Sequence, residues 1–169
     1  RDRIENAYQP KHKDWDKVIF IIEKNDDSLD LDYEEIHVNN DNLKEQQRLI
    51  YDNSKELFGN KEKIIFLGGD HSISYSIGRA FLESCKENAF ESVDEQEESK
   101  EKDKKEQEPC LVVFDAHADC MPPNKEPTHE EWLRGLIEKG FPTENILLVG
   151  SRNLYKEEDK FLDDSGVKR

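Results

Sequence analysis

Two stretches of the sequence decide the fold: residues 63–72 read KIIFLGGDHS, and residues 110–119 read CLVVFDAHAD. Each begins as a short apolar run rich in β-branched residues, which is typical of a buried strand (63–67 and 110–114). Each then changes abruptly to small and ionisable residues. Similar apolar runs occur at residues 17–22 (KVIFII) and 146–149 (ILLV). The pattern therefore predicts four buried strands.

Amphipathic segments separate these strands and predict helices. The predicted helices cover about residues 42–58, 72–87, 129–139 and 156–162. Thr128 and Glu131 carry the spacing of a capping box before the third of them. Residues 25–41 are expected to be irregular. Alternation of apolar strands with helices predicts an α/β fold with three α/β/α layers, in which helices cover both faces of a mainly parallel sheet.

The composition excludes several classes of protein. The chain of 169 residues has 25 basic and 40 acidic side chains, a net charge of −15, which argues against a nucleic-acid-binding surface. No stretch approaches the roughly 18 apolar residues of a membrane span. No signal peptide opens the sequence, and three cysteines (Cys85, Cys110 and Cys120) make no even disulfide framework. We therefore expect a reduced, cytoplasmic protein with no membrane or nucleic-acid partner.

The organisation along the chain points to one partial domain over residues 1–169. Residues 91–108 are almost entirely Glu, Asp, Lys, Gln and Ser, so we expect a disordered acidic insert without a function of its own. The sequence starts without Met and ends on Gly166-Val167-Lys168-Arg169, where a helix-terminating Gly precedes the first residue of a new strand. These ends predict a fragment of a longer protein, incomplete on its C-terminal side.

The strand end at residues 115–119 carries the chemistry. Ligands of parallel α/β sheets bind beyond the carboxyl ends of the strands. On an extended chain the side chains of Asp115, His117 and Asp119 point to one side. Two carboxylates close together are unfavourable without a neutralising cation, and this donor set suits Mn²⁺ and tolerates Fe²⁺, Zn²⁺ or Co²⁺. The alternative interpretation is a strand-end aspartate beside a surface histidine.

The strand end at residues 68–72 is equivalent. Gly68 and Gly69 allow a tight turn and close backbone approach, and His71 lies where the next helix starts. Asp70 either orients a ligand imidazole or caps that helix, and His71 by itself is also compatible with an ordinary loop histidine. Together the two strand ends predict one metal site, formed by His71, Asp115, His117 and Asp119.

The combination of these motifs resembles the arginase/agmatinase (ureohydrolase) family. The motif GGDHS is followed roughly forty residues later by DAHAD at the end of an apolar strand, and the resemblance extends from Lys63 to Arg152, including the GSR at residues 150–152. It implies a centre of two Mn²⁺ ions at the edge of a three-layer α/β/α domain. In that centre His71 and Asp119 bind one ion, His117 binds the other, and Asp115 bridges both.

The resemblance also implies an activity. Family members hydrolyse the guanidino group of a small substrate such as agmatine or arginine to urea and an amine, through attack by a hydroxide held between the ions. Metal coordination lowers the pKa of water from 15.7 to about 7, which supplies that hydroxide. Asp119 would then serve catalysis as a ligand, and His129 would carry the proton to the leaving amine. Otherwise His129 is an exposed residue in a first helical turn. Trimeric or hexameric homo-oligomers are also implied.

Two departures from the family pattern leave alternatives open. The later segment S-x-D-x-D-x-x-D-P, which supplies further metal ligands in the family, does not occur in residues 1–169. Residues 120–123 read CMPP where arginases carry an Asn that helps bind arginine, and we read Cys120 as a packing residue. One alternative is a non-catalytic metal-binding or interaction protein on the same scaffold. Another is a hydrolase of a formimino or other C–N bond.

Overall fold

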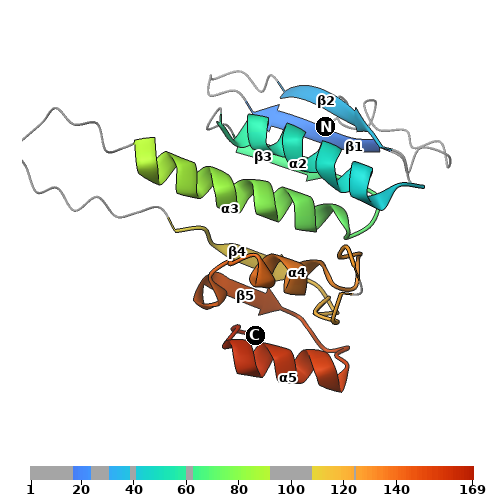
Figure 1. The fold of residues 1–169 in the computed structure, drawn as a ribbon, viewed down its shortest axis with the longest axis vertical. Helices are drawn as coiled ribbons and strands as arrows, with labels where there is room; N and C mark the ends of the chain where they lie inside the picture. Colours follow the sequence, from blue (N-terminus) through green and yellow to red (C-terminus); the bar gives the residue numbers. More distant parts are fainter. Residues whose placement is uncertain (1–16, 24–30, 39–40, 60–62, 92–107, 124) are drawn as a thin grey trace, which may run out of the picture.

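The computed structural model describes residues 17–23, 31–38, 41–59, 63–91, 108–123 and 125–169. Along these residues strands and helices follow one another as the sequence predicted, with one additional strand (Figure 1). The elements are β1 (Lys17–Glu23), β2 (Leu31–His37), α2 (Leu43–Gly59), β3 (Lys63–Leu67), α3 (Ile73–Glu91), β4 (Leu111–Phe114), α4 (Trp132–Glu138), a 3₁₀ turn (Thr143–Asn145), β5 (Ile146–Val149) and α5 (Lys156–Ser165).

The first sheet has the strand order β2-β1-β3, with β1 antiparallel to both neighbours. Val18 pairs with Ile36 of β2, and Phe20 pairs with Phe66 of β3. The expectation that residues 25–41 are irregular was wrong, because β2 lies within them. β2 runs antiparallel to β1, and α2 then connects β2 to β3. β2 and β3 therefore run in the same direction, one on each side of β1. The predicted parallel pairing therefore does not hold around β1.

The second sheet pairs β4 with β5 in parallel, as predicted. Val113 lies opposite Leu148 in this pair. On the other side of β5 the chain after α5 returns, and the Leu148 N–H donates to the Lys168 carbonyl oxygen at 2.8 Å. Gly166, at the left-handed φ of 73°, ends α5 and directs the chain there. The prediction that a strand-like segment starts after this glycine is confirmed.

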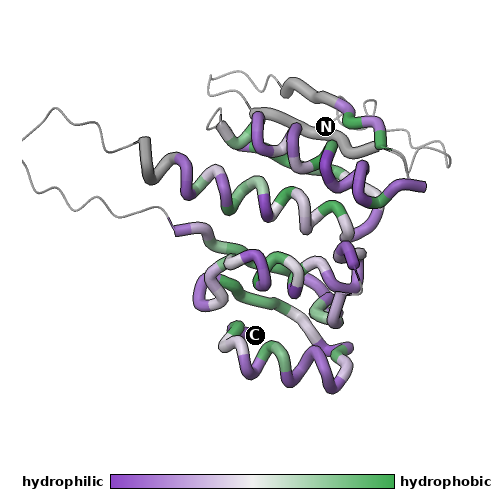
Figure 2. Tube along the Cα trace, in the orientation of Figure 1, coloured by the Kyte–Doolittle hydropathy of each residue, from purple (hydrophilic) through white to green (hydrophobic). Residues whose placement is uncertain are grey.

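Helix α3 connects the two halves of the structure, because it packs against α2 on one side and α4 on the other (Figure 1). The contact with α4 is close: a Cβ added at Gly78 would lie 2.7 Å from Leu136 Cδ2. Below α3, β5 is a hydrophobic segment and α5 alternates between hydrophilic and hydrophobic residues (Figure 2). The buried core on this side contains Val113, Leu133, Leu136, Ile146, Leu148 and Leu162.

In β3, β4 and β5, side chains at alternate positions are apolar and exposed to solvent. The described helices cover one face of β3, β4 and β5. The predicted fold has helices on both faces, and none of the described helices covers the second face of these strands. Phe114 is 79% exposed, although its neighbour Val113 is 8% exposed. The other side chains of this open face are Ile65, Leu67, Val112, Leu147 and Val149.

The bounds of three helices differ from the prediction by three residues or more, and one of them is α5, which continues to Ser165. Helix α3 continues to Glu91, and residues 92–107 of the predicted acidic insert lie outside the described residues. Helix α4 begins at Trp132 instead of His129. The predicted Thr128–Glu131 contact is present, because the Thr128 N–H donates to Glu131 Oε2 at 2.8 Å, but it closes a turn ahead of the helix.

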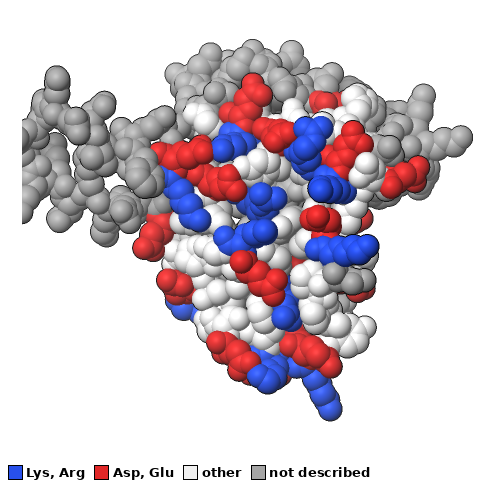
Figure 3. Space-filling view, in the orientation of Figure 1, with Lys and Arg blue, Asp and Glu red and all other residues white. Residues whose placement is uncertain are grey.

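The charged side chains on the face shown in Figure 3 have both signs, with Lys and Arg interspersed among Asp and Glu. None of the helices in the described ranges has the length and hydropathy needed to cross a membrane.

Candidate metal centre

The candidate site lies beyond the carboxyl ends of β3 and β4. His71 follows β3, and Asp115 and Asp119 follow β4. One potential ligand atom from each of the three residues lies within 4.8 Å of the other two. Residues separated by more than forty positions in the sequence thus form one cluster, which contains three of the four predicted ligands.

His71 lies between the two carboxylates. Its Nδ1 is 2.7 Å from Asp119 Oδ2 and 3.2 Å from Asp115 Oδ2. The hydrogen bond with Asp119 raises the pKa of His71 above its usual value, burial opposes this, and the negative charges of the nearby aspartates add to the increase. The two nearby carboxylates therefore favour the protonated form of the His71 imidazole.

Asp115 is held in its ionised form. Burial by itself raises the pKa of Asp115, but the hydrogen bond from the His117 N–H, the charge of His71 and the hydrogen bond from the Ala116 N–H together lower it below its usual value. The His117 N–H donates to Asp115 Oδ1 at 3.0 Å. The Asp115 N–H donates to the Val149 carbonyl oxygen at 3.2 Å, which continues the pairing of β4 with β5 into the site.

Asp119 adopts the left-handed φ of 52°, which is uncommon for a residue other than glycine. Its carbonyl oxygen accepts the Leu133 N–H at 3.2 Å, and its Oδ2 accepts the Trp132 indole N–H at 2.9 Å. The next residue, Cys120, donates its N–H to Glu158 Oε1 at 2.9 Å. Contacts from α4 and α5 therefore hold this turn of the backbone.

The turn after β3 depends on glycine. A Cβ added at Gly68 would lie 2.1 Å from Ile73 Cδ1, so a larger residue there would require the Ile73 side chain at the start of α3 to move. Asp70 Oδ1 accepts the Ser72 N–H at 2.8 Å. Of the two roles open to Asp70, this hydrogen bond supports the capping one.

Two of the predicted site residues lie outside the three-residue cluster. The side chain of His117 is 61% exposed, and its Nδ1 is 3.5 Å from Asp115 Oδ1. The side chain of His129 is 58% exposed, with Nε2 3.9 Å from Glu130 Oε1. The expectation that residues 115, 117 and 119 converge assumed an extended chain. The left-handed turn at Asp119 instead brings the two aspartates together with His71 and leaves His117 at the rim.

Sequence reasoning missed two residues that contact the site, Trp132 and Glu158. Trp132 is 3% exposed and Glu158 is also 3% exposed. Glu158 had a weak signal, because its three-residue spacing from Tyr155 fits a capping box, whose hydrogen bond from the Tyr155 N–H to Glu158 Oε2 is 2.9 Å long. The second bond of Glu158, to Cys120, depends on tertiary structure and has no sequence signal.

The donor set fits a hard divalent cation. Two carboxylates and one imidazole lie close together, and carboxylate oxygens with imidazole nitrogen suit Mn²⁺ and its neighbours. Cys120 adjoins Asp119 but is fully buried, and burial together with the nearby charge of Glu158 raises the pKa of its thiol to about 12. A thiol that stays protonated is a poor ligand, which agrees with the reading of Cys120 as a packing residue.

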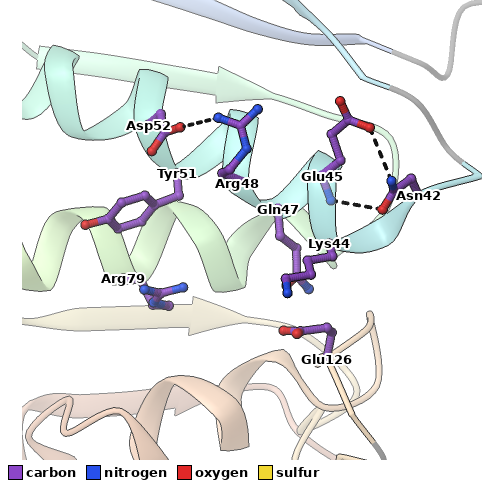
Figure 4. Close-up of a pocket in the computed structure, with 9 residues that line it drawn as sticks. All are labelled: Asn42, Lys44, Glu45, Gln47, Arg48, Tyr51, Asp52, Arg79 and Glu126. Carbon is purple, nitrogen blue, oxygen red and sulfur yellow. Dashed lines mark hydrogen bonds and ion pairs between the residues drawn. The ribbon is translucent and has the colours of Figure 1, made fainter.

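A separate groove of about 610 Å³ lies between α2, α3 and the loop that carries Glu126 (Figure 4). Its charged residues largely engage other groups of the protein. Arg48 Nη1 is 3.0 Å from Asp52 Oδ2, and the Arg79 guanidinium lies 4.8 Å from the centre of the Tyr51 ring. The metal-ligand cluster of His71, Asp115 and Asp119, whose potential ligand atoms lie within 4.8 Å of one another, is therefore the better candidate for a functional site.

Comparisons with known proteins identify the fold and the family of the chain. The solved structure of formimidoylglutamase from Bacillus subtilis subsp. subtilis str. 168 is similar, with a TM-score of 0.52 and 17% sequence identity over 73% of this chain. The present chain spans 33% of that protein's length. No curated protein matches the chain. The model of the family described as "Arginase family" matches residues 7–169, and the chain, an α/β protein with an incomplete arginase-like fold, belongs to that family.

Proposed function

We propose that the complete protein is a manganese-dependent hydrolase that releases urea from a small guanidino compound such as agmatine or arginine. The single observation that carries this proposal is the cluster of His71, Asp115 and Asp119, whose ligand atoms lie within 4.8 Å of one another. The cluster lies at the carboxyl ends of two strands in a member of the arginase family. A divalent cation held there would supply Lewis-acid activation of water near neutral pH.

The residues of the chain have distinct proposed roles. His71, Asp115 and Asp119 hold cations, and His71 must release its proton to do so. The exposed side chain of His117 joins them by rotation about its side-chain bonds, since its Nδ1 is already 3.5 Å from Asp115 Oδ1. A second Mn²⁺ ion would need His117 and the acidic segment that the sequence of residues 1–169 lacks. His129, whose side chain is exposed, would carry a proton to the leaving amine.

The test is urea release by the complete gene product loaded with Mn²⁺, with agmatine and arginine offered separately. We expect turnover that is lost on chelation and restored by Mn²⁺. Asp119→Asn removes a ligand charge and should reduce kcat/KM at least 100-fold. The matched control is Asp52→Asn, which changes an exposed aspartate of α2 and should leave activity unchanged.

Failure of the loaded protein to act on any guanidino compound would reject this function. Retained binding of Mn²⁺ without turnover would then favour a non-catalytic metal-binding protein on the same scaffold.

A second candidate substrate is a formimidoyl compound, because the similar solved structure is a formimidoylglutamase. The chemistry is closely related, since water attacks the carbon of an amidine instead of that of a guanidine and releases formamide in place of urea. Assays for formamide and urea on the same preparation separate the two. Two further expectations belong to the same proposal: the homo-oligomeric state implied by the family resemblance and the cytoplasmic location expected from the composition of the sequence. Light scattering of the complete protein tests the oligomeric state.

A further inference from the structure

Trp132 makes two separate contacts with the metal-ligand cluster. Its indole N–H donates to Asp119 Oδ2 at 2.9 Å, and its ring centre lies 4.7 Å from that of His71 at an interplanar angle of 46°. Trp132 is the first residue of α4 and is 3% exposed. A single rigid side chain therefore contacts two of the three clustered residues.

Helix α4 holds Asp119 at two points. Leu133 donates its N–H to the Asp119 carbonyl oxygen at 3.2 Å, and the neighbouring Trp132 donates to the Asp119 carboxylate. Asp119 has a left-handed φ of 52°, a conformation that residues other than glycine keep only where the surroundings fix it. The start of α4 thus fixes both the backbone and the side chain of this residue.

The two hydrogen bonds to Asp119 Oδ2 come from different kinds of donor. The His71 ring has two nitrogens, either of which is a possible metal ligand, and its Nδ1 donates to Asp119 only when that nitrogen carries a proton. The Trp132 indole N–H is always a donor and is no metal ligand. Trp132 is therefore the partner whose hydrogen bond to the Asp119 carboxylate does not depend on the state of His71.

We propose that Trp132 is a positioning residue of the metal centre, which orients the Asp119 carboxylate for cation binding through its indole N–H. The proposal rests on the proposed metal-binding function. Removal of a hydrogen bond that orients a metal ligand typically weakens metal affinity 10–100-fold. The alternative is that Trp132 is a core residue whose buried indole N–H needs a hydrogen-bond acceptor, and that its bond to Asp119 has no effect on metal affinity.

The experiment compares Trp132→Phe with Leu136→Val in the complete protein, with free Mn²⁺ measured by electron paramagnetic resonance. Trp132→Phe keeps an aromatic ring beside His71 and removes the N–H. Leu136→Val, in the same buried helix, reduces packing without touching Asp119. We expect the Kd for Mn²⁺ to rise 10–100-fold in Trp132→Phe and to stay within threefold of the parent in Leu136→Val, although both variants unfold at lower temperature.

A second measurement does not depend on a metal. In the metal-free protein the indole ¹H–¹⁵N resonance of Trp132 should move upfield in Asp119→Asn, because an amide oxygen is a weaker acceptor than a carboxylate. Trp15→Phe leaves one indole signal and makes the assignment unambiguous, since the sequence contains two tryptophans.

The measured affinities distinguish the positioning role of Trp132 from the proposed function. An unchanged Mn²⁺ affinity in Trp132→Phe, or an equal loss in Leu136→Val, overturns the positioning role. A parent protein that binds Mn²⁺ but hydrolyses nothing overturns the proposed function and leaves the comparison of affinities valid. A parent protein that binds no divalent cation overturns both proposals.

Discussion

At the scale of single residues, His71 links the pH to the stability of the metal-free protein. Its pKa is raised in the folded state, chiefly by the hydrogen bond with Asp119. This contribution to the free energy of unfolding is complete below the ordinary histidine pKa of about 6.5 and is lost as the pH rises through the higher folded value. We therefore expect urea denaturation of chelator-treated protein to show a larger contribution of His71 at pH 5.5 than at pH 8.5.

The matched variants for this prediction are His71→Asn and His129→Asn. His71→Asn should remove the pH-dependent part of the stability between pH 5.5 and 8.5, whereas His129→Asn, at an exposed side chain, should retain it. An identical pH dependence in the parent and in His71→Asn would contradict the assignment.

The cysteines should differ sharply in reactivity. Cys110 is exposed, whereas Cys120 is fully buried and burial with the charge of Glu158 raises its pKa to about 12. Because the thiolate is the reactive form, we expect iodoacetamide at pH 8 to label Cys110 readily and Cys120 only after denaturation. Peptide mass spectrometry measures both sites in one sample. Rapid labelling of Cys120 in the folded protein would show that its surroundings are open.

The sequence pattern predicts the positions of some residues of the candidate site but not of others. Asp115 and His71 follow apolar strands, and their proximity follows from the rule that ligands gather at strand ends. The position of His117 was not predictable in the same way, because the left-handed turn at Asp119 is imposed by hydrogen bonds from α4 and α5. Trp132 entered the site through tertiary packing for the same reason.

At the scale of elements, Glu158 connects α5 to the turn that carries Asp119. Its two carboxylate oxygens accept the N–H groups of Cys120 and Tyr155 at 2.9 Å each. Glu158→Ala would leave the buried Cys120 N–H without its acceptor and would remove a helix cap. We expect the free energy of unfolding to fall by about 2–4 kcal/mol, measured by urea denaturation followed by circular dichroism.

Glu157→Ala is the control, since Glu157 precedes Glu158 on the same first turn and is exposed. It should change the free energy of unfolding by less than about 0.5 kcal/mol. Equal effects of the two substitutions would mean that charge in the first turn of α5, and not the bond to Cys120, is what matters.

Among the described elements, strand β2 was not predicted from the sequence. β2 reads LDYEEIH, and its run of acidic residues interrupts the alternation expected of a half-buried strand. It forms at the edge of the first sheet, where charged side chains are common because they discourage further pairing. Its pairing with β1 then decides that β1 is antiparallel to both neighbours, which no local pattern around β1 indicates.

At the scale of the whole molecule, the alternation of buried and exposed apolar residues in β4 and β5 divides the second sheet into two faces. Val113, Ile146 and Leu148 pack against α4 and α5, whereas Val112, Phe114, Leu147 and Val149 are exposed. The sequence shows that these strands are apolar on both sides, which is typical of a sheet covered twice. It does not show which described helix covers which face. Large contiguous patches of exposed apolar side chains are rare on monomeric proteins.

This arrangement predicts opposite behaviour for two adjacent residues of β4. Phe114 is 79% exposed, so Phe114→Ser in the 169-residue chain should change the free energy of unfolding by less than about 0.5 kcal/mol while lowering both the binding of a hydrophobic dye such as ANS and self-association in light scattering. Val113 is 8% exposed, so Val113→Ala should cost about 1–3 kcal/mol and leave dye binding by the folded protein unchanged. If Phe114→Ser instead destabilised the chain as much as Val113→Ala, the side chain of Phe114 would have to be buried in solution, and the open face would not exist.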